Sequence, residues 1–176
     1  PPPAPPPPPA PLPPPPAPPP SPPADDPIPV TPPVNTLPPP QTIAEDSPLV
    51  LGGALAISIA DADSVSLRTT VTVTSGTLTA VTGGSAFIVG NGTSSVQISG
   101  STAQINFALN GLRFTPAADT PGSVTMTVTT IDGVFTDTDT VPITVTPVVD
   151  IVNDAATTAM NTAVTINVLG NDTFEG

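Results

Sequence analysis

Proline is distributed so unevenly along this chain that it divides the sequence into two parts with different structural prospects. Of the 30 prolines, 25 lie within residues 1–40, and the others are Pro48, Pro116, Pro121, Pro142 and Pro147. Proline lacks the backbone N–H that helices and sheets require, and its ring fixes one backbone dihedral. Residues 1–40 therefore cannot build a core, and a folded domain is expected only from residue 41 onward.

Residues 1–24 consist only of proline, alanine, leucine and serine. This composition is typical of a polyproline II rod, because each residue before a proline is also pushed to extended geometry. At about 3.1 Å per residue the tract would span roughly 75 Å. Three roles remain open: a solvated linker, a rod packed against neighbouring chains, and a ligand for a polyproline-binding domain. Residues 25–40, where apolar residues appear between prolines, are expected to form an extended linker.

The charge of the chain is strongly one-sided. It has 14 acidic residues, two arginines, no lysine and no histidine, and its formal net charge is −12. Phosphate backbones and anionic lipids would repel such a surface, so binding to nucleic acid or to a membrane surface is not expected, whereas Ca²⁺ is a natural partner. Membrane insertion is not expected either, because the sequence shows no apolar span. The chain also has no cysteine, which excludes disulfides and thiolate metal sites. It begins without methionine and shows no signal peptide, which is typical of a mature product or an internal fragment.

From residue 41 the apolar residues recur with a period of two. The segment 68–82 is predicted to be a β-hairpin that turns at Ser75–Gly76. Further strands are predicted at 95–100, 111–116, 123–132 and 138–147. Short strands separated by Gly, Asn, Asp or Pro turns predict an all-β fold, an antiparallel β-sandwich over residues 41–148. Threonines on the solvent face would keep the sheet soluble without lysine.

One segment, STAQINFALNGLRF, interrupts this alternation with helical spacing. Ser101 or Thr102 is a suitable N-cap, and Gly111 provides a C-terminal stop. We therefore expect one short helix that crosses the sandwich, with Phe107 and Leu109 plugging one end of the core.

Three stretches together resemble a known repeat: QTIAEDSPLVLGGALAISIADAD, then VTVTSGTLTAVTGG, then a long segment that includes INFALNGLRFTPAAD. Over about residues 36–148 the chain is similar to the cadherin-like, immunoglobulin-like tandem repeats of very long bacterial adhesins, including those with RTX-type secretion. The most specific part is the short helix, the Leu-Asn-Gly stop and the strand that ends in Thr-Pro. The resemblance implies an extracellular β-sandwich on the bacterial cell surface.

Residues 149–176 resemble a linker and the start of a following repeat, with a first strand expected at Ala163–Val168. A lone strand could not bury its alternating Val164, Ile166 and Val168, and its backbone edge would be open. Two interpretations remain open. Either the segment belongs to a repeat that continues beyond this sequence, or it is a strand donated to another chain, which would build a filament.

Acidic residues cluster in short loops that could bind a hard cation. Resemblance to cadherin-like repeats implies Ca²⁺ at the junctions between domains, with Asp150, Asn153 and Asp154 matching the junction and Glu45, Asp61 and Asp63 matching the acidic loops that face it. The alternative is that these residues only form turns. The candidate metal ligands are Glu45, Asp61, Asp63, Asp150, Asn153 and Asp154.

Catalysis is not expected, because the chain has no His, Cys, Lys or Tyr to serve as base or nucleophile. The preferred hypothesis is a non-catalytic structural or adhesion protein, a stalk or filament subunit of a bacterial surface fibre, stiffened by polyproline and Ca²⁺. Its partners would be neighbouring repeats or copies of itself. The alternative is a β-sandwich module that binds carbohydrate or a host protein, although recognition hot spots favour Trp, Tyr and Arg, and this chain has neither Trp nor Tyr.

Overall fold

The computed structural model describes residues 1–5, 30–149, 153–170 and 172. Most of the predicted polyproline rod, residues 6–24, lies outside the described residues, as does residue 150. Residues 1–5 are exposed and belong to no helix or strand.

The described residues confirm an all-β sandwich with one short α-helix. In chain order the strands are β1 (Val34–Thr36), β2 (Gln41–Ala44), β3 (Leu49–Leu51), β4 (Ser58–Ala60), β5 (Leu67–Val73), β6 (Thr77–Thr79), β7 (Phe87–Val89), β8 (Ser95–Gly100), β9 (Leu112–Thr115), β10 (Gly122–Ile131) and β11 (Thr136–Thr146). A 3-10 turn occupies Gly53–Leu55, and the helix α1 occupies Thr102–Leu109.

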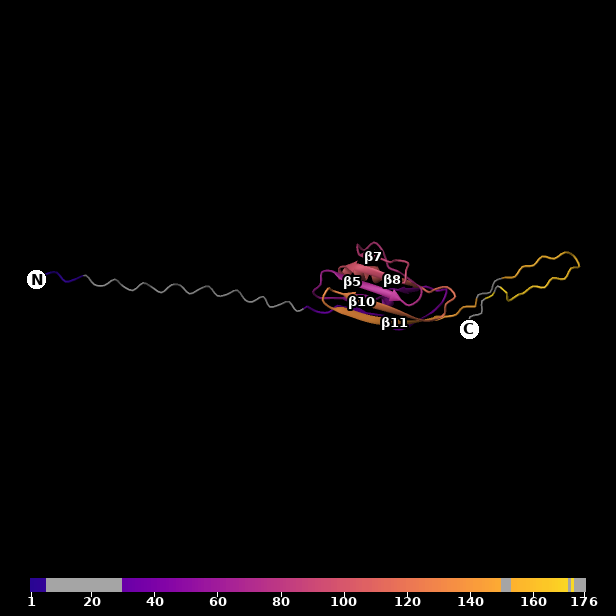
Figure 1. Cartoon of the computed structure of the whole chain (residues 1–176), viewed down its shortest axis with the longest axis horizontal. Helices are drawn as coiled ribbons and strands as arrows, with labels where there is room; N and C mark the ends of the chain where they lie inside the picture. The colour runs from indigo at the N-terminus through magenta and orange to yellow at the C-terminus, as the bar shows by residue number, and fades with distance from the viewer. Residues whose placement is uncertain (6–29, 150–152, 171, 173–176) are drawn as a thin grey trace.

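The larger layer is a six-stranded sheet in the order β2-β11-β10-β5-β8-β7, part of which is visible in Figure 1. Its longest pairing is the β10–β11 hairpin, whose antiparallel register runs from Gly122 opposite Val145 to Ile131 opposite Thr136. The edge strand β2 is parallel to β11, while the other pairs are antiparallel.

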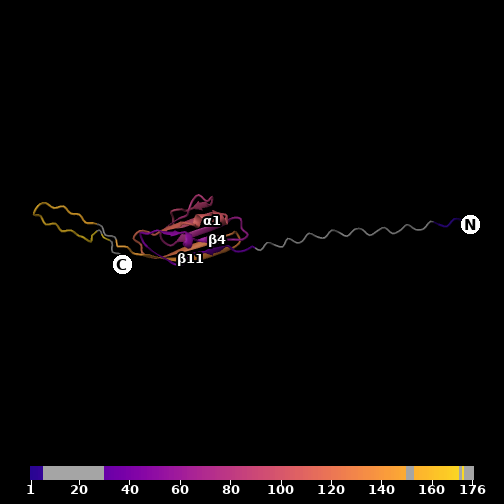
Figure 2. The same cartoon turned by 180° about the vertical axis from the view of Figure 1, so that it is seen from behind.

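The second layer consists of the three-stranded sheet β3-β9-β6 and the two-stranded pair β1-β4. Between the layers lies one hydrophobic core, to which Leu51, Leu78 and Phe114 contribute from this side and Val71, Met126 and Ile143 from the larger sheet. Helix α1 packs against β8 and β4, beside β4 in Figure 2.

The strands β5, β10 and β11 lie side by side in the larger sheet and share the two-residue period of the sequence. Their valines, Ile143 and Met126 alternate inward, whereas most threonines alternate outward. Thr69 and Thr130 are the exceptions, since both are buried on the inward face. In register, Thr70, Thr129 and Thr138 form one outward row, and Thr72, Thr127 and Thr140 form the next; the rows lie on the solvent face predicted for threonine.

The helix begins where the sequence predicts. Ser101 is the N-cap of a capping box: its hydroxyl accepts a hydrogen bond from the Gln104 N–H (3.4 Å), and the Gln104 side chain accepts one from the Ser101 N–H (2.9 Å). Leu109 is buried as expected, but Phe107 is 49% exposed. The expectation that Phe107 plugs the core is therefore wrong, because the helix turns Ile105, Ala108 and Leu109 inward.

The predicted hairpin at 68–82 is also wrong. β5 pairs with β8 and β10 in the larger sheet, whereas β6 pairs with β9 in the other layer. The turn at residues 74–76 therefore connects the two layers. Gly76 has φ +84, and a Cβ there would meet the backbone oxygen of Thr115 at 2.4 Å, so only glycine fits this crossing.

The N-terminal boundary differs from the predicted one. β1 lies inside the segment expected to be an extended linker, pairs with β4 and contacts β10 and β11. The reason is Asn35, a buried polar residue whose bonds reach across the sandwich. At the other end, Ala163–Val168 is not a strand: residues 153–170 are exposed and contain only turns and irregular backbone.

Several strand edges are covered by side chains or loops. The Asn106 amide pairs with both backbone groups of Ile59 in β4, accepting from its N–H (2.7 Å) and donating to its carbonyl (2.9 Å). The Asn91 amide does the same for Ala80, just after β6. Each amide replaces a neighbouring strand and blocks pairing with another chain.

The part of the chain that the structure describes includes no helix that is both long and apolar enough to cross a lipid bilayer.

Candidate functional site

The strand directions define two poles of the sandwich. At the entry pole, the chain arrives near Thr31 and Asn35 beside the start of β11, because the Asn35 N–H donates to the Asp137 carboxylate (2.7 Å). At the exit pole, the chain leaves near Val148, after β11 has run its 11 residues. At about 3.3 Å per residue the poles lie roughly 35 Å apart, and Figure 1 shows these described segments at opposite ends of the sandwich.

Glu45 lies at the exit pole and is only 3% exposed. Its N–H donates to the Thr146 carbonyl (3.0 Å), which continues the β2–β11 ladder, and its Oε1 accepts from the Val148 N–H (2.6 Å). Its Oε2 is enclosed and has no hydrogen-bond partner among the described residues. An unpaired buried carboxylate oxygen is costly, so this atom is one that a cation could satisfy.

Asp61 and Asp63 lie at the entry pole. Asp61 Oδ1 accepts from the N–H groups of Asp63 (3.2 Å) and Ser64 (2.7 Å), which closes a turn, while its enclosed Oδ2 has no partner in the described part of the chain. Asp63 accepts from the N–H (3.1 Å) and the hydroxyl (2.8 Å) of Thr31. It thereby ties the incoming chain to the end of β4.

Glu45 therefore lies apart from Asp61 and Asp63, at the other pole of the sandwich. Asp150 lies outside the described residues, and Asn153 and Asp154 are exposed in the segment after β11. Within the described ranges, no three acidic, histidine or cysteine side chains come close enough together to hold a metal ion. Glu45 belongs to the exit pole, and Asp61 and Asp63 belong to the entry pole.

The entry pole contains a buried polar network that the sequence analysis missed. Asn35 Oδ1 accepts from the Thr130 hydroxyl (2.6 Å), and that hydroxyl lies 3.0 Å from the hydroxyl of Thr69. Asn35 Nδ2 donates to Asp139 (3.3 Å) and to the Val128 carbonyl (3.4 Å). The network joins β1 to β10, β5 and β11. Its signals in the sequence are weak: a lone asparagine between Val34 and Thr36, and threonines at the inward positions 69 and 130.

Asp132 also belongs to the entry pole. Its Oδ1 accepts from the N–H groups of Val134 and Phe135, both at 2.6 Å, and so shapes the β10–β11 turn. Its Oδ2 is enclosed and lacks a partner within the described residues. This carboxylate has a structural task in the turn.

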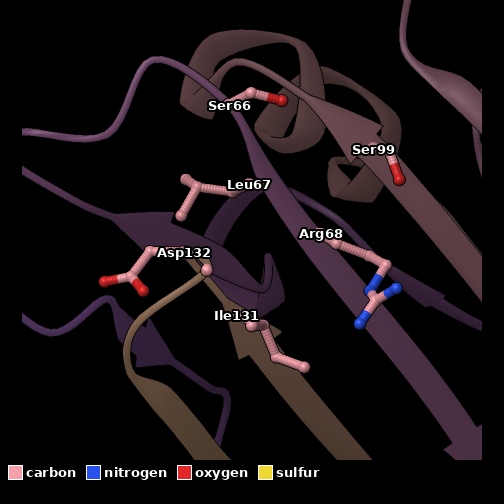
Figure 3. Close-up of a pocket in the computed structure, with 7 residues that line it drawn as sticks. Ser66, Leu67, Arg68, Ser99, Ile131 and Asp132 are labelled. Atoms are coloured by element: carbon pink, nitrogen blue, oxygen red, sulfur yellow. The ribbon is translucent and has the colours of Figure 1, made fainter.

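A shallow pocket of about 350 Å³ opens beside this turn, lined by Ser66, Leu67, Arg68, Ser99, Ile131, Asp132 and Gly133. Figure 3 shows Arg68 and Asp132 on opposite sides of it, pointing away from each other. The pocket holds neither a general base next to a nucleophile nor an aromatic platform for a sugar.

No family model matches this chain, and no curated protein matches it. The fold and the two poles define the protein as an all-β sandwich that its chain traverses from end to end.

Proposed function

We propose that this chain is a non-catalytic structural element of an extracellular bacterial surface fibre, a stalk or filament subunit that holds an adhesive end away from the cell. The observation that supports this most directly is the separation of the two poles. Thr31 is tied to Asp63 at one pole and Val148 to Glu45 at the other. A domain entered and left at opposite ends can be joined in series and can transmit tension.

The strand directions suit such a role. A pull on the incoming chain is borne first by β1, which is paired with β4, and then draws β2 toward the entry pole. Because β2 is parallel to β11, a pull on the outgoing chain draws β11 in the opposite direction, toward the exit pole. The two strands are then loaded in opposite directions along their length. The hydrogen bonds between them share the force, instead of breaking one after another.

The chemistry of the surface supports a structural role over recognition. The outward face of the larger sheet carries rows of threonines, and the chain contains neither Trp nor Tyr for a binding hot spot. It also lacks His, Cys, Lys and Tyr, the usual catalytic bases and nucleophiles. The resemblance to bacterial adhesin repeats supports the extracellular location, with neighbouring repeats or further copies of the chain as partners.

Ca²⁺ belongs to this proposal as a stiffening ligand. At the exit pole, Glu45 would contribute its enclosed Oε2, and Asp150, Asn153 and Asp154 of the following segment would supply further oxygens. Asp61 and Asp63 would serve in the same way at the entry pole toward a preceding domain. Hard cations prefer several oxygen ligands, and oxygen is what these side chains offer.

Solution scattering together with electron microscopy of the full chain tests the spacer role. We expect an elongated particle, much longer than the sandwich alone, with the sandwich as a bead. A compact particle with the proline-rich residues folded onto the sheets would contradict the proposal.

Calcium is tested separately by thermal melting with Ca²⁺ and with a chelator, using the unsubstituted chain and Glu45→Gln. We expect Ca²⁺ to raise the melting temperature of the unsubstituted chain more than that of Glu45→Gln, which keeps Asp61 and Asp63 at the entry pole. If Ca²⁺ leaves the melting temperature of the unsubstituted chain unchanged, the metal has no part in the function.

A further inference from the structure

The larger sheet ends in β7, an edge strand with exposed apolar side chains. β7 pairs with β8 on one side, with Phe87 opposite Ser99 and Val89 opposite Gln97. Phe87 is 68% exposed and Val89 is 49% exposed, both on the outward face of the sheet. An apolar edge strand is a template for pairing with another chain.

The edge strands β2, β3, β4 and β6 have features that oppose such pairing. Asn106 occupies the backbone of Ile59 in β4, and in β6 Leu78 donates to the Thr93 carbonyl (2.8 Å). β2 follows three consecutive prolines, and in β3 the exposed Val50 lies opposite Arg113. Prolines, charges and covering side chains are the usual means of blunting an edge. Among the described residues, β7 carries none of these features.

The same chain contains a segment that has the apolar alternation of a strand but belongs to none of the described sheets. Residues 163–168, AVTINV, alternate Val164, Ile166 and Val168 with other residues, and all three are exposed. This is the pattern of a half-buried strand without a sheet to join. The side chains on this face are large and apolar, as are the exposed side chains of Phe87 and Val89.

Charge also favours this pairing over others. No charged residue occurs between Arg68 and Arg113, the stretch that contains β7 and β8, and none occurs between Asp154 and Asp172, which flank the segment. In a chain of net charge −12, two copies repel each other over most of their surfaces. The β7 edge and residues 163–168 can approach without bringing carboxylates together.

We infer that residues 163–168 of one copy add as a strand to the β7 edge of a second copy, with Val164, Ile166 and Val168 on the same face as Phe87 and Val89. This inference rests on the proposed function, because it names the contact by which copies join. Main-chain hydrogen bonds would hold the added strand, and the paired apolar side chains would set its register. Since β7 is only three residues long, few hydrogen bonds would form between the copies. We therefore expect a weak association that needs a high protein concentration.

Disulfide trapping between copies tests the register and the face. The chain has no cysteine, so single substitutions report cleanly. Val89→Cys in one copy is mixed under mild oxidation with Val164→Cys, Ile166→Cys or Val168→Cys in a copy that carries a mass tag. Neighbouring strands bring cysteines on one face within disulfide distance. We expect at least one of the three mixtures to give several times more heterodimer than the controls.

Two controls are matched to the expected geometry. Thr165→Cys lies in the same segment but on the opposite face of the added strand. Val50→Cys, in place of Val89→Cys, lies on the β3 edge. Val50 is 54% exposed, a fraction close to the 49% of Val89. Both controls should give little heterodimer.

Equal yields with either control, or no heterodimer in any mixture, would overturn the inference. Its failure is distinguishable from failure of the proposed function. An elongated particle in scattering without heterodimer would leave the spacer role intact and remove only the β7 contact. A compact particle would contradict the spacer role whatever the cross-links show.

Discussion

The two poles of the sandwich secure the chain by different means. At the entry pole, Asn35 is bonded to Thr130, Asp137 and Asp139, and Asp63 adds a second tie to Thr31. At the exit pole, the outgoing chain after β11 is held by Glu45, which binds the N–H of Val148. The entry pole therefore holds the incoming chain through two side chains, Asn35 and Asp63. At the exit pole, Glu45 still has one enclosed oxygen, Oε2, without a partner among the described residues.

Carboxylates in similar sequence contexts therefore contribute differently to the stability of the fold. Asp63 is exposed and its bonds compete with water, whereas Glu45 is buried and its bonds do not. The position of each group relative to the core, rather than its identity, determines how much of the fold depends on it. Substitutions at the two poles test this difference, because they change the free energy of unfolding by different amounts.

The largest effect is expected for Asn35→Ala at the entry pole. The substitution leaves the buried Thr130 hydroxyl and the Val128 carbonyl without the Asn35 amide, and we expect the free energy of unfolding to fall by about 3 kcal/mol. Urea denaturation measures this change. Asn153→Ala, at an exposed asparagine, is the control and should stay within about 0.5 kcal/mol. Equal small effects would show that the network does not secure β1.

A smaller effect is expected for Glu45→Ala at the exit pole. The Val148 N–H loses its acceptor and a buried space opens, so the free energy of unfolding should fall by about 2 kcal/mol in the absence of Ca²⁺. Glu45→Gln keeps an acceptor for this N–H and should lose less. The comparison of the poles fails if Glu45→Ala is no more destabilising than Asp63→Ala.

The smallest effect is expected for Asp63→Ala. Its bonds to Thr31 are exposed, so the free energy of unfolding should change by about 0.5 kcal/mol. Hydrogen exchange gives a more sensitive measurement, since the Thr31 N–H should exchange faster while the N–H groups of β10 keep their protection. Unchanged exchange at Thr31 would mean that Asp63 does not tie the incoming chain.

Much of the fold could be predicted from the sequence because it depends on local patterns. The two-residue alternation located β8, β10 and β11 to within two residues, and the capping residues located α1. The pairing of β5 and β6 could not be predicted, since Ser75–Gly76 is equally suited to a hairpin and to a crossing between layers. The contact of Gly76 with Thr115 and Phe114, which decides the matter, is long-range.

The site was harder to predict than the fold. Acidic pairs in the sequence indicated cation binding, but Glu45 and the Asp61–Asp63 pair lie at opposite poles because β2 and β4 end in opposite directions. The network around Asn35 was missed altogether. A single asparagine in a proline-rich stretch resembles a turn residue, and only the packed sandwich shows that it is buried.

Single-molecule pulling tests whether the sandwich resists tension between its two poles. Because the chain has no cysteine, handles can be attached through Val30→Cys, at an exposed position of the entry pole, and Val149→Cys, or through Thr120→Cys and Val149→Cys, both at the exit pole. The first pair loads β1 and then shears β2 against β11, while the second unzips β10 from β11. We predict a clearly higher unfolding force for the first pair, and an equal or lower force would contradict the account.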